Sequence, residues 1–442
     1  MQLPSLLGHA QELLQTIRNS EKPADSLIDT FFRSRKYLGS RDRRFLAETT
    51  YGTLRHLRRC EVLLWKVLEG TKAEIGREDG FLLLTVTYLV AIARQSDLLS
   101  TDVTVKLQSS HLKELAPDLL QRLSSMEVVP LQDPVERMGV NYSFPDWMVE
   151  RCMREYGEEE AERILASLNE PAPITLRVNT LKSSVDECRK ALLQEEVETE
   201  VTNLSPLGLQ LAKRANIFQM QAFRDGFFEV QDEGSQLLPQ IIDPKPTAKL
   251  LDACAGAGGK TLAFAALMKN RGEIVATDVN NFRLEELRKR ARRAGVFNVR
   301  SREIGDVADL VQDHGGTFDV VFLDVPCSGL GTIRRNPGMK WMVTEETVTE
   351  LSEKQRHILE GAAPLVKKGG RLVYATCTLL RKENEEVVEE FLGRHSEFTI
   401  LEAKSYLAKC NLPHLASGPY VKLFPHRDGT DGFFCAVLER NR

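Results

Sequence analysis

Apolar residues recur at helical spacing along the N-terminal part of the chain. Leu63, Leu64 and Val67 illustrate the pattern, which returns between Leu82 and Val90. A repeat of three and four residues gathers apolar side chains on one face of a helix. We therefore predict a small all-α domain over residues 1–130.

The pattern changes after this domain. Residues 128–145 are rich in proline and polar side chains, which predicts a linker. Residues 146–168 have the pattern of helices rich in Glu and Arg, and alternating β-branched residues over 171–182 predict a strand. We predict a small α+β subdomain over residues 146–226. It either holds RNA or braces the domain that follows, and the pattern leaves both open.

From Phe227 onward, short apolar runs alternate with amphipathic stretches. Such runs are typical of strands buried on both faces of a parallel sheet. Their alternation with helices predicts an α/β fold over residues 227–442, with a doubly wound parallel sheet and right-handed crossovers. The predicted strands and helices are, in order, Lys249–Ala253, Thr261–Lys269, Glu273–Thr277, Phe282–Ala294, Val299–Ile304, Asp319–Leu323, Glu353–Val366, Arg371–Tyr374 and Glu383–Leu392.

The composition is that of a soluble globular protein, with 42% hydrophobic and 28% charged residues. Apolar runs long enough for a membrane span are absent, and the first residues lack the basic start and apolar core of a secretion signal. The eight cysteines are scattered, so neither a disulfide framework nor a zinc site is indicated. We expect a cytoplasmic protein with reduced thiols and no metal.

The formal net charge of −4 argues against a surface that is basic throughout. Basic residues are nevertheless clustered: residues 33–59 contain nine Lys or Arg against two acids. A second cluster lies between Arg288 and Arg293. Each cluster is either an RNA-binding surface or a solvated helix face.

Candidate chemistry follows the apolar run Val320–Leu323. The chain there presents Asp324, Pro326 and Cys327 in quick succession. Ligands of open α/β sheets bind just beyond the carboxyl ends of the strands, so an acid and a thiol at this place are candidates for catalysis. The alternative is that Cys327 is a small buried hydrophobe, as free cysteines usually are.

A second thiol, Cys377, ends the predicted strand Arg371–Tyr374. If this strand neighbours the one that ends at Asp324, the two lie about 4.8 Å apart, and Cys327 and Cys377 face one crevice. A structural disulfide is the alternative, which the expected compartment disfavours.

A glycine-rich turn follows the first strand of the predicted sheet. Glycines let a ligand approach the backbone and the amides of a helix N-terminus. Acids follow the next three strands, at Asp278, Asp306 and Asp324. Three carboxylates suit a nucleoside without phosphates, such as the cationic sulfonium S-adenosyl-L-methionine. Asp278 can accept hydrogen bonds from ribose hydroxyls.

The rival interpretation of this turn is a P-loop NTPase. Gly259, Lys260 and Thr261 match the end of that motif, and Asp324 could hold magnesium. The first required glycine is Cys254 here, so we disfavour it.

Two thiols, an acid and a methyl sulfonium together suit methylation at carbon 5 of cytosine. That carbon is a poor nucleophile until a thiolate adds at carbon 6, while an acid near ring N3 neutralises the developing charge. The base must be unstacked, which single-stranded or looped RNA makes less costly.

Four motifs resemble the Sun (Fmu) family of RNA cytosine-5 methyltransferases: Asp324-Val-Pro-Cys-Ser-Gly, Tyr374-Ala-Thr-Cys-Thr with Glu383-Asn-Glu-Glu, Val230-Gln-Asp-Glu-Gly-Ser-Gln and Thr430-Asp-Gly-Phe-Phe. The basic stretch from Ser34 to Arg55 resembles the NusB family of RNA-binding helical domains.

The resemblance implies S-adenosyl-L-methionine as cofactor and small-subunit (16S) ribosomal RNA as substrate. The cofactor residues that it implies are Cys254, Ala255, Gly256, Ala257, Gly258, Gly259, Lys260, Asp278, Asp306 and Asp324. It further implies that Cys377 is the nucleophile, that Cys327 aids product release and that Asp324 contacts the base and the cofactor. One departure is Ala257, which stands where the family has proline. Nothing demands more than a monomer. The alternatives are a cytosine-5 methyltransferase for transfer RNA or other nucleic acid, and a non-catalytic RNA-binding assembly factor.

Overall fold

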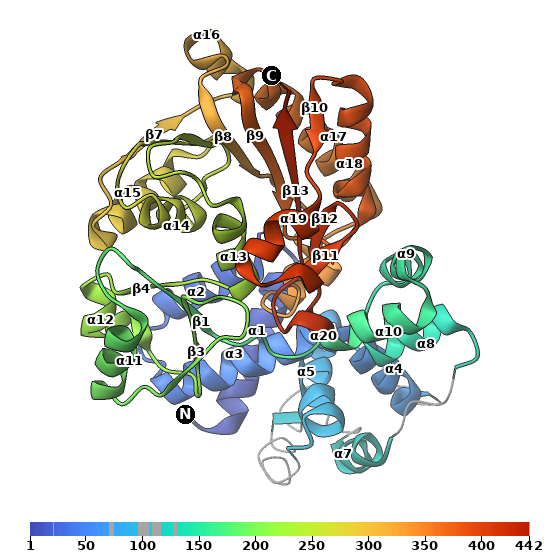
Figure 1. The fold of residues 1–442 in the computed structure, drawn as a ribbon. Coiled ribbons are helices and arrows are strands. Elements are labelled where there is room, and N and C mark those ends of the chain that lie inside the picture. The colour runs from blue at the N-terminus through green and yellow to red at the C-terminus, as the bar shows by residue number, and fades with distance from the viewer. Residues whose placement is uncertain (21, 70–74, 96–105, 108–115, 127–130, 442) are drawn as a thin grey trace. The chain divides into compact units, whose positions relative to one another are not determined.

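The computed structural model describes residues 1–20, 22–69, 75–95, 106–107, 116–126 and 131–441. Parts of the predicted all-α domain and of the predicted linker, including residues 128–130, lie outside the described residues. The chain forms two compact units, which Figure 1 shows as a ribbon. Unit 1 comprises Met1–Glu170 and Ile333–Thr344, and unit 2 comprises Pro171–Thr332 and Glu345–Arg442. The predicted three-domain boundaries divide the chain differently and stay a prediction.

Unit 1 is helical, as the apolar repeat predicts. In α1 the buried residues recur at helical spacing, from Leu6 and Leu7 through Ala10 to Leu13 and Leu14, and they form one apolar face. The α-helices of unit 1 are α1 (Leu3–Arg18), α2 (Ala24–Ser34), α3 (Ser40–Arg55), α4 (Leu57–Leu68), α5 (Arg77–Thr87), α7 (Ala116–Ser125), α8 (Pro134–Asn141), α9 (Asp146–Tyr156) and α10 (Glu158–Ser167), and a π-helical turn, η1 (Tyr88–Ile92), follows α5.

The predicted linker is wrong where the structure describes it, because it contains α8. The Asp133 carboxylate accepts the Glu136 N–H at 2.8 Å, and Pro134 occupies the first turn, where its missing N–H costs nothing. A capped proline at a helix start was taken for a turn.

Unit 1 also takes a segment from the second half of the sequence. Residues Ile333–Thr344 form the short helix η6 (Pro337–Trp341), which packs against α3. Lys340 is fully buried, and its ammonium donates to the carbonyl oxygens of Arg55 at 3.0 Å and Ser143 at 3.1 Å and to Asn169 Oδ1 at 2.5 Å. The sequence analysis did not predict this exchange.

Unit 2 contains two sheets, of which the smaller is four-stranded and antiparallel with the order β2-β3-β1-β4. Its strands are β1 (Thr175–Val178), β2 (Thr199–Val201), β3 (Gly208–Leu211) and β4 (Phe228–Val230), with helices α11 (Val185–Gln194) and α12 (Gln221–Arg224). The predicted boundary at residue 226 assigns β4 to the catalytic domain. The structure places it here, because β4 pairs with β1 and Phe228 lies in this sheet's core.

The larger sheet has nine strands. Its order is β11-β12-β13-β9-β8-β5-β6-β7, and β10 pairs with β13. The five neighbouring strands β9, β8, β5, β6 and β7 are parallel, as predicted. The sheet as a whole is mixed rather than parallel, because β13 runs antiparallel to β9. Its strands are β5 (Lys249–Asp252), β6 (Glu273–Asp278), β7 (Val299–Glu303), β8 (Phe318–Asp324), β9 (Val366–Thr376), β10 (Phe398–Ile400), β11 (Ala416–Ser417), β12 (Tyr420–Leu423) and β13 (Phe433–Arg440).

Helices cover both faces of this sheet. Val320 and Phe322 of β8 face one apolar core, and Val321 and Leu323 face the other, because successive strand residues point in opposite directions. The second core includes residues of α17 and α18, which lie together beside the sheet in Figure 1. The α-helices of this part are α13 (Glu233–Ile242), α14 (Gly259–Leu267), α15 (Asn281–Ala294), α16 (Val311–His314), α17 (Glu345–Ala362), α18 (Glu385–Arg394), α19 (Ala403–Leu407) and α20 (Pro425–Asp428).

Candidate active site

A cavity of about 830 Å³ opens in unit 2 beyond the carboxyl ends of β5, β6, β8 and β9. This is where ligands of open α/β sheets bind. The parallel pairing of β8 with β9 places the residues after both strands in this cavity.

Residues 254–260, which run from the end of β5 into the start of α14, are the predicted cofactor-binding residues, and we call them the cofactor loop. Its Gly258 adopts φ +84°, and a Cβ there would lie 2.6 Å from Leu287, so only glycine fits. The Gly256 N–H donates to Asp278 Oδ2 at 2.9 Å, which ties the loop to the end of β6. The backbone of the loop can therefore come close to a ligand.

The acids that follow β6 and β7 also line the cavity. Asp278 Oδ1 accepts the Asn280 N–H at 2.9 Å. Asp306 Oδ1 accepts the Ala308 N–H at 2.8 Å, and Oδ2 lies 2.6 Å from Nε2 of His357, which α17 contributes. Although partial burial opposes it, these bonds hold the pKa of Asp306 below its usual range.

A further acid, Asp252, ends β5 and is almost fully buried. Its Oδ2 accepts the Thr261 hydroxyl at 2.6 Å, whereas Oδ1 is buried and has no hydrogen-bond partner within the part of the chain that the structure describes. Burial, with the like charges of Asp324 and Asp278, raises the pKa of Asp252 to about 7. Oδ1 is an unfilled acceptor on a residue that lines the cavity.

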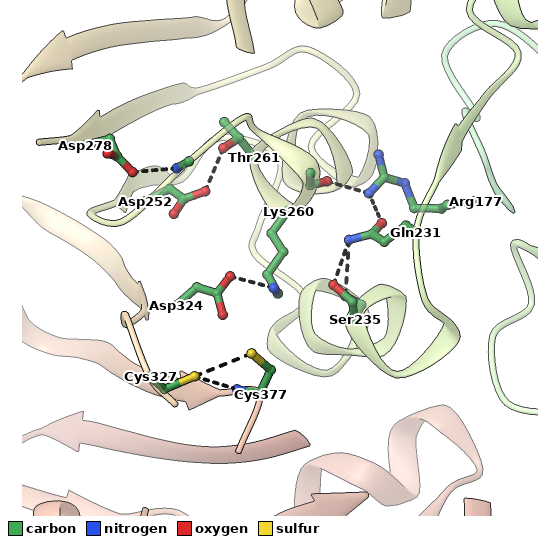
Figure 2. A network of polar contacts seen from close by, with 12 residues as sticks. Arg177, Gln231, Ser235, Asp252, Lys260, Thr261, Asp278, Asp324, Cys327 and Cys377 are labelled. Carbon is green, nitrogen blue, oxygen red and sulfur yellow. Dashed lines mark hydrogen bonds and ion pairs between the residues drawn. The ribbon is translucent and has the colours of Figure 1, made fainter. Parts of the chain in front are cut away.

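Lys260 and Asp324 form an ion pair inside the cavity, with Nζ 2.6 Å from Oδ2 (Figure 2). Burial disfavours the ammonium, but the carboxylate of Asp324 outweighs it and holds the pKa of Lys260 above its usual range. Cys377 also lies within the electrostatic reach of Lys260.

The two predicted thiols lie together. Cys327 Sγ and Cys377 Sγ are 3.4 Å apart, and the Cys377 N–H approaches Cys327 Sγ at the same distance (Figure 2). Both are free thiols. The bond with Cys377, burial and the negative charge of Glu383 hold the pKa of Cys327 well above its usual range. Cys327 is therefore held as a neutral thiol.

Glu383 fixes the two loops that carry these thiols. It is fully buried and accepts the Ser328 N–H at 2.8 Å, the Ser328 hydroxyl and Gln355 Nε2 at 3.0 Å. The Ser328 hydroxyl also lies 2.9 Å from the Thr378 hydroxyl. Because Ser328 follows Cys327 and Thr378 follows Cys377, the Ser328 hydroxyl links the two thiol loops, and Glu383 holds Ser328 in place.

The structure brings the predicted site residues together. All of them line the cavity except Gly258, which shapes the cofactor loop from behind. The residues that the sequence analysis missed are Asp252, Gln231, Ser235, Arg290, Lys354 and His357. Asp252 carries the signal used for the other acids, a carboxylate at a strand end. Gln231 and Ser235 lie in the motif of residues 230–236 that carries the family resemblance, and Arg290 lies in the second basic cluster. Lys354 and His357 come from α17, and no local signal marks them.

The lining fits S-adenosyl-L-methionine. The unfilled Asp252 Oδ1 can accept from an ammonium or hydroxyl group, and the carboxylates suit a cation. The backbone of the cofactor loop, Asp278 and Asp306 would hold it.

No group of three or more His, Cys, Asp or Glu in the described ranges could hold a metal ion. No helix among the described residues is long and apolar enough to cross a membrane.

The fold and the cavity define a Rossmann-like methyltransferase. A family described as "16S rRNA methyltransferase RsmB/F" matches residues 239–439, and the ferredoxin-like domain of the same proteins matches 144–218. The chain belongs to this RsmB/F family, which confirms the predicted resemblance, and its cofactor is S-adenosyl-L-methionine.

Relatives and solved structures agree with this assignment. The chain is 32% identical to the probable ribosomal RNA small subunit methyltransferase B of Synechocystis, over 97% of this chain and 98% of that protein. It is 31% identical to the Bacillus subtilis protein of the same description, over the full length of both. The crystal structure of PH0851 has a TM-score of 0.78 at 28% identity and covers 98% of this chain and 99% of that one.

Proposed function

We propose that this enzyme methylates carbon 5 of a cytosine in small-subunit (16S) ribosomal RNA, with Cys377 as the nucleophile and Cys327 as the residue that assists product release. The observation that carries the proposal is the pair of thiols, 3.4 Å apart, in the cavity that also contains the cofactor loop. Methylation of an exocyclic nitrogen or a ribose hydroxyl needs no thiol, whereas carbon 5 of cytosine needs a nucleophile at carbon 6.

The charges around the two thiols support different roles for them. Lys260 is a cation within electrostatic reach of Cys377 and can balance negative charge in the addition step. Glu383 disfavours a thiolate at Cys327. The first thiol is thus the better nucleophile and the second the better proton carrier.

The steps balance as follows. The Cys377 thiolate forms a bond to carbon 6, and the electrons of the carbon 5–carbon 6 double bond move toward carbon 5, which takes the methyl group. When bound, S-adenosyl-L-methionine supplies that group as an electrophilic carbon on its sulfonium sulfur. The Lys260–Asp324 pair gives a proton to ring N3 during addition and takes it back during elimination.

Elimination restores the ring. The bond from Cys377 sulfur to carbon 6 breaks, and the departing sulfur takes the proton of Cys327. The Cys327 thiolate that results takes the proton of carbon 5, so that both cysteines end as thiols and the double bond is restored. The short distance between the two sulfur atoms supports this relay.

Two observations favour ribosomal RNA as the substrate. The relatives matched over nearly their whole length are described as ribosomal RNA small subunit methyltransferases. Unit 1 carries the basic stretch between Arg33 and Arg59, which can contact phosphates. Transfer RNA is the alternative substrate, and labelling of transfer RNA in place of ribosomal RNA would identify it.

The experiment measures methyl transfer from tritiated S-adenosyl-L-methionine to 16S ribosomal RNA, followed by digestion and mass spectrometry of the nucleosides. The wild type should yield 5-methylcytidine. Cys377→Ala should lose at least about 10³-fold in rate, because the nucleophile is gone. Cys327→Ala should accumulate a covalent protein–RNA complex on a denaturing gel, and the double variant should not.

Cys410→Ala is the matched control, because Cys410 is a partly exposed thiol that does not line the cavity. It should retain wild-type activity. An active Cys377→Ala, or an adduct that requires Cys327, would overturn the assigned roles. A product methylated elsewhere than carbon 5 would overturn the reaction, and label in transfer RNA alone would overturn the substrate.

A further inference from the structure

Two arginines donate hydrogen bonds to carbonyl oxygens of the cofactor loop. Arg290 Nη1, on α15, donates to Ala257 O at 2.8 Å, and Arg177 Nη1, on β1, donates to Gly259 O at 2.6 Å. Figure 2 shows Arg177 reaching the loop together with Gln231. Neither bond belongs to the regular ladder of a helix or sheet.

Arg290 is itself held by a carboxylate of the four-stranded sheet. Glu229 of β4 is almost fully buried, and its Oε2 accepts Arg290 Nε at 3.1 Å and Nη2 at 3.0 Å. Its Oε1 accepts Arg293 Nη2 at 2.5 Å. A guanidinium held on two sides has little freedom left, so its third contact, to the loop, is fixed in direction.

The loop needs such support from outside. Residues 255–259 are all Gly or Ala, and Gly256 and Gly258 both have positive φ. Glycine-rich backbone loses the most conformational freedom when it is ordered. A ligand that orders the loop on binding loses affinity, unless the protein has ordered it beforehand.

We propose that Glu229 and Arg290 are positioning residues for S-adenosyl-L-methionine: through Ala257 they hold the cofactor loop in its binding geometry, and the four-stranded sheet thereby contributes to cofactor affinity. This inference rests on the assignment of residues 254–260 as the cofactor loop.

The same helix offers a matched pair of variants. Arg290 and Arg293 both bind Glu229, but only Arg290 is bonded to the loop. Arg290→Gln should weaken the binding of S-adenosylhomocysteine, measured by calorimetry, about tenfold, because the loop must then be ordered by the ligand. Arg293→Gln should change the dissociation constant by less than about twofold, whatever it does to thermal stability.

A rescue separates positioning from direct contact, since Arg290 also lines the cavity. Ala257→Pro restricts the loop by itself, because proline fixes φ, and among the residues that the structure describes the Ala257 N–H donates to no backbone carbonyl. In the Ala257→Pro background, Arg290→Gln should reduce the affinity for S-adenosylhomocysteine by less than about threefold. Glu229 does not line the cavity. Glu229→Gln should also weaken the binding of S-adenosylhomocysteine, and Ala257→Pro should restore it. This variant replaces Arg290→Gln in the test if Arg290→Gln does not fold.

Equal effects of Arg290→Gln and Arg293→Gln, or a loss that Ala257→Pro leaves unchanged, would overturn the proposal. The proposed function is tested separately by the wild type and Cys377→Ala, which should both bind S-adenosylhomocysteine. If neither binds, the cofactor loop is misassigned; if both bind and the variants behave alike, only the positioning role fails.

Discussion

Lys260 Nζ lies 2.6 Å from Asp324 Oδ2, although 64 positions separate the two residues in the chain. Lys260 lies in the first turn of α14 and Asp324 ends β8, so the ion pair joins the cofactor loop to the strand that leads to Cys327. Cofactor and base would meet at this pair.

Asp324→Asn should reduce kcat by at least about 100-fold and change cofactor affinity much less, because the charge acts on the base. Asp324 raises the pKa of Lys260 and burial lowers it. Without the carboxylate the pKa of Lys260 falls, so the alkaline limb of the residual pH–rate profile should move to lower pH. Steady-state kinetics with ribosomal RNA and calorimetry with S-adenosylhomocysteine check both parts. An alkaline limb that stays in place would contradict the argument.

Asp252→Asn should stabilise the ligand-free protein in a pH-dependent way. The pKa of Asp252 rises from an ordinary 3.8 to about 7 on folding. Between these two pH values the folded protein keeps the proton that the unfolded chain has lost. The free energy of unfolding therefore falls as the pH rises from about 4 to about 7. The variant should gain little at pH 4 and up to about 4 kcal/mol above pH 7. It keeps an acceptor for Thr261 but should bind cofactor more weakly.

Thermal unfolding at pH 5 and pH 8 tests this expectation. Asp225→Asn, at an exposed carboxylate, is the control and should behave alike at both values. An Asp252→Asn gain that is equal at the two pH values would rule out ionisation as its cause.

Glu383→Ala should lower kcat by about 100-fold with little effect on cofactor binding. Ser328, which follows Cys327 and contacts Thr378 beside Cys377, would lose its acceptor. Glu383→Gln can still accept from the Ser328 N–H and should retain most of the activity. It removes the charge that helps to raise the pKa of Cys327, so alkylation of Cys327 by iodoacetamide should begin at lower pH. Equal activity of Glu383→Ala and Glu383→Gln would show that Glu383 does not position the loops that carry the two thiols.

Lys340→Ala should destabilise unit 1 by about 3 to 5 kcal/mol, because buried acceptors lose their donor and a cavity is left. Amide hydrogen exchange should accelerate in α3 and α8, whose ends adjoin Arg55 and Ser143. Lys36→Ala, at an exposed lysine, should leave the exchange unchanged. Unaltered protection in Lys340→Ala would show that η6 is only loosely held.

The strand ends of the large sheet could be predicted because local pattern determines them. The apolar run of β8 and the thiols at the ends of β8 and β9 are visible in short stretches, and parallel pairing then brings Cys327 and Cys377 together. The antiparallel β13 was not predicted, because it pairs between β12 and β9 and its direction is set by those long-range pairings rather than by a local pattern.

What the sequence could not indicate are contacts made by tertiary packing alone. Arg290 looked like one member of a basic helix face, and only the fold turns it toward Glu229 and the Ala257 carbonyl. Lys340 resembled any loop lysine, since nothing local says that an ammonium will be enclosed by carbonyl groups.

The segment Ile333–Thr344 makes the two units inseparable as inherited modules. The chain passes between them after Glu170, Thr332 and Thr344, so neither unit is a continuous stretch of gene. A recombination event or a protease cut after Glu170 would release the helices without Lys340, and the carbonyls that it serves would be left bare. The helical unit and the catalytic unit are therefore expected to be gained, lost and exchanged together.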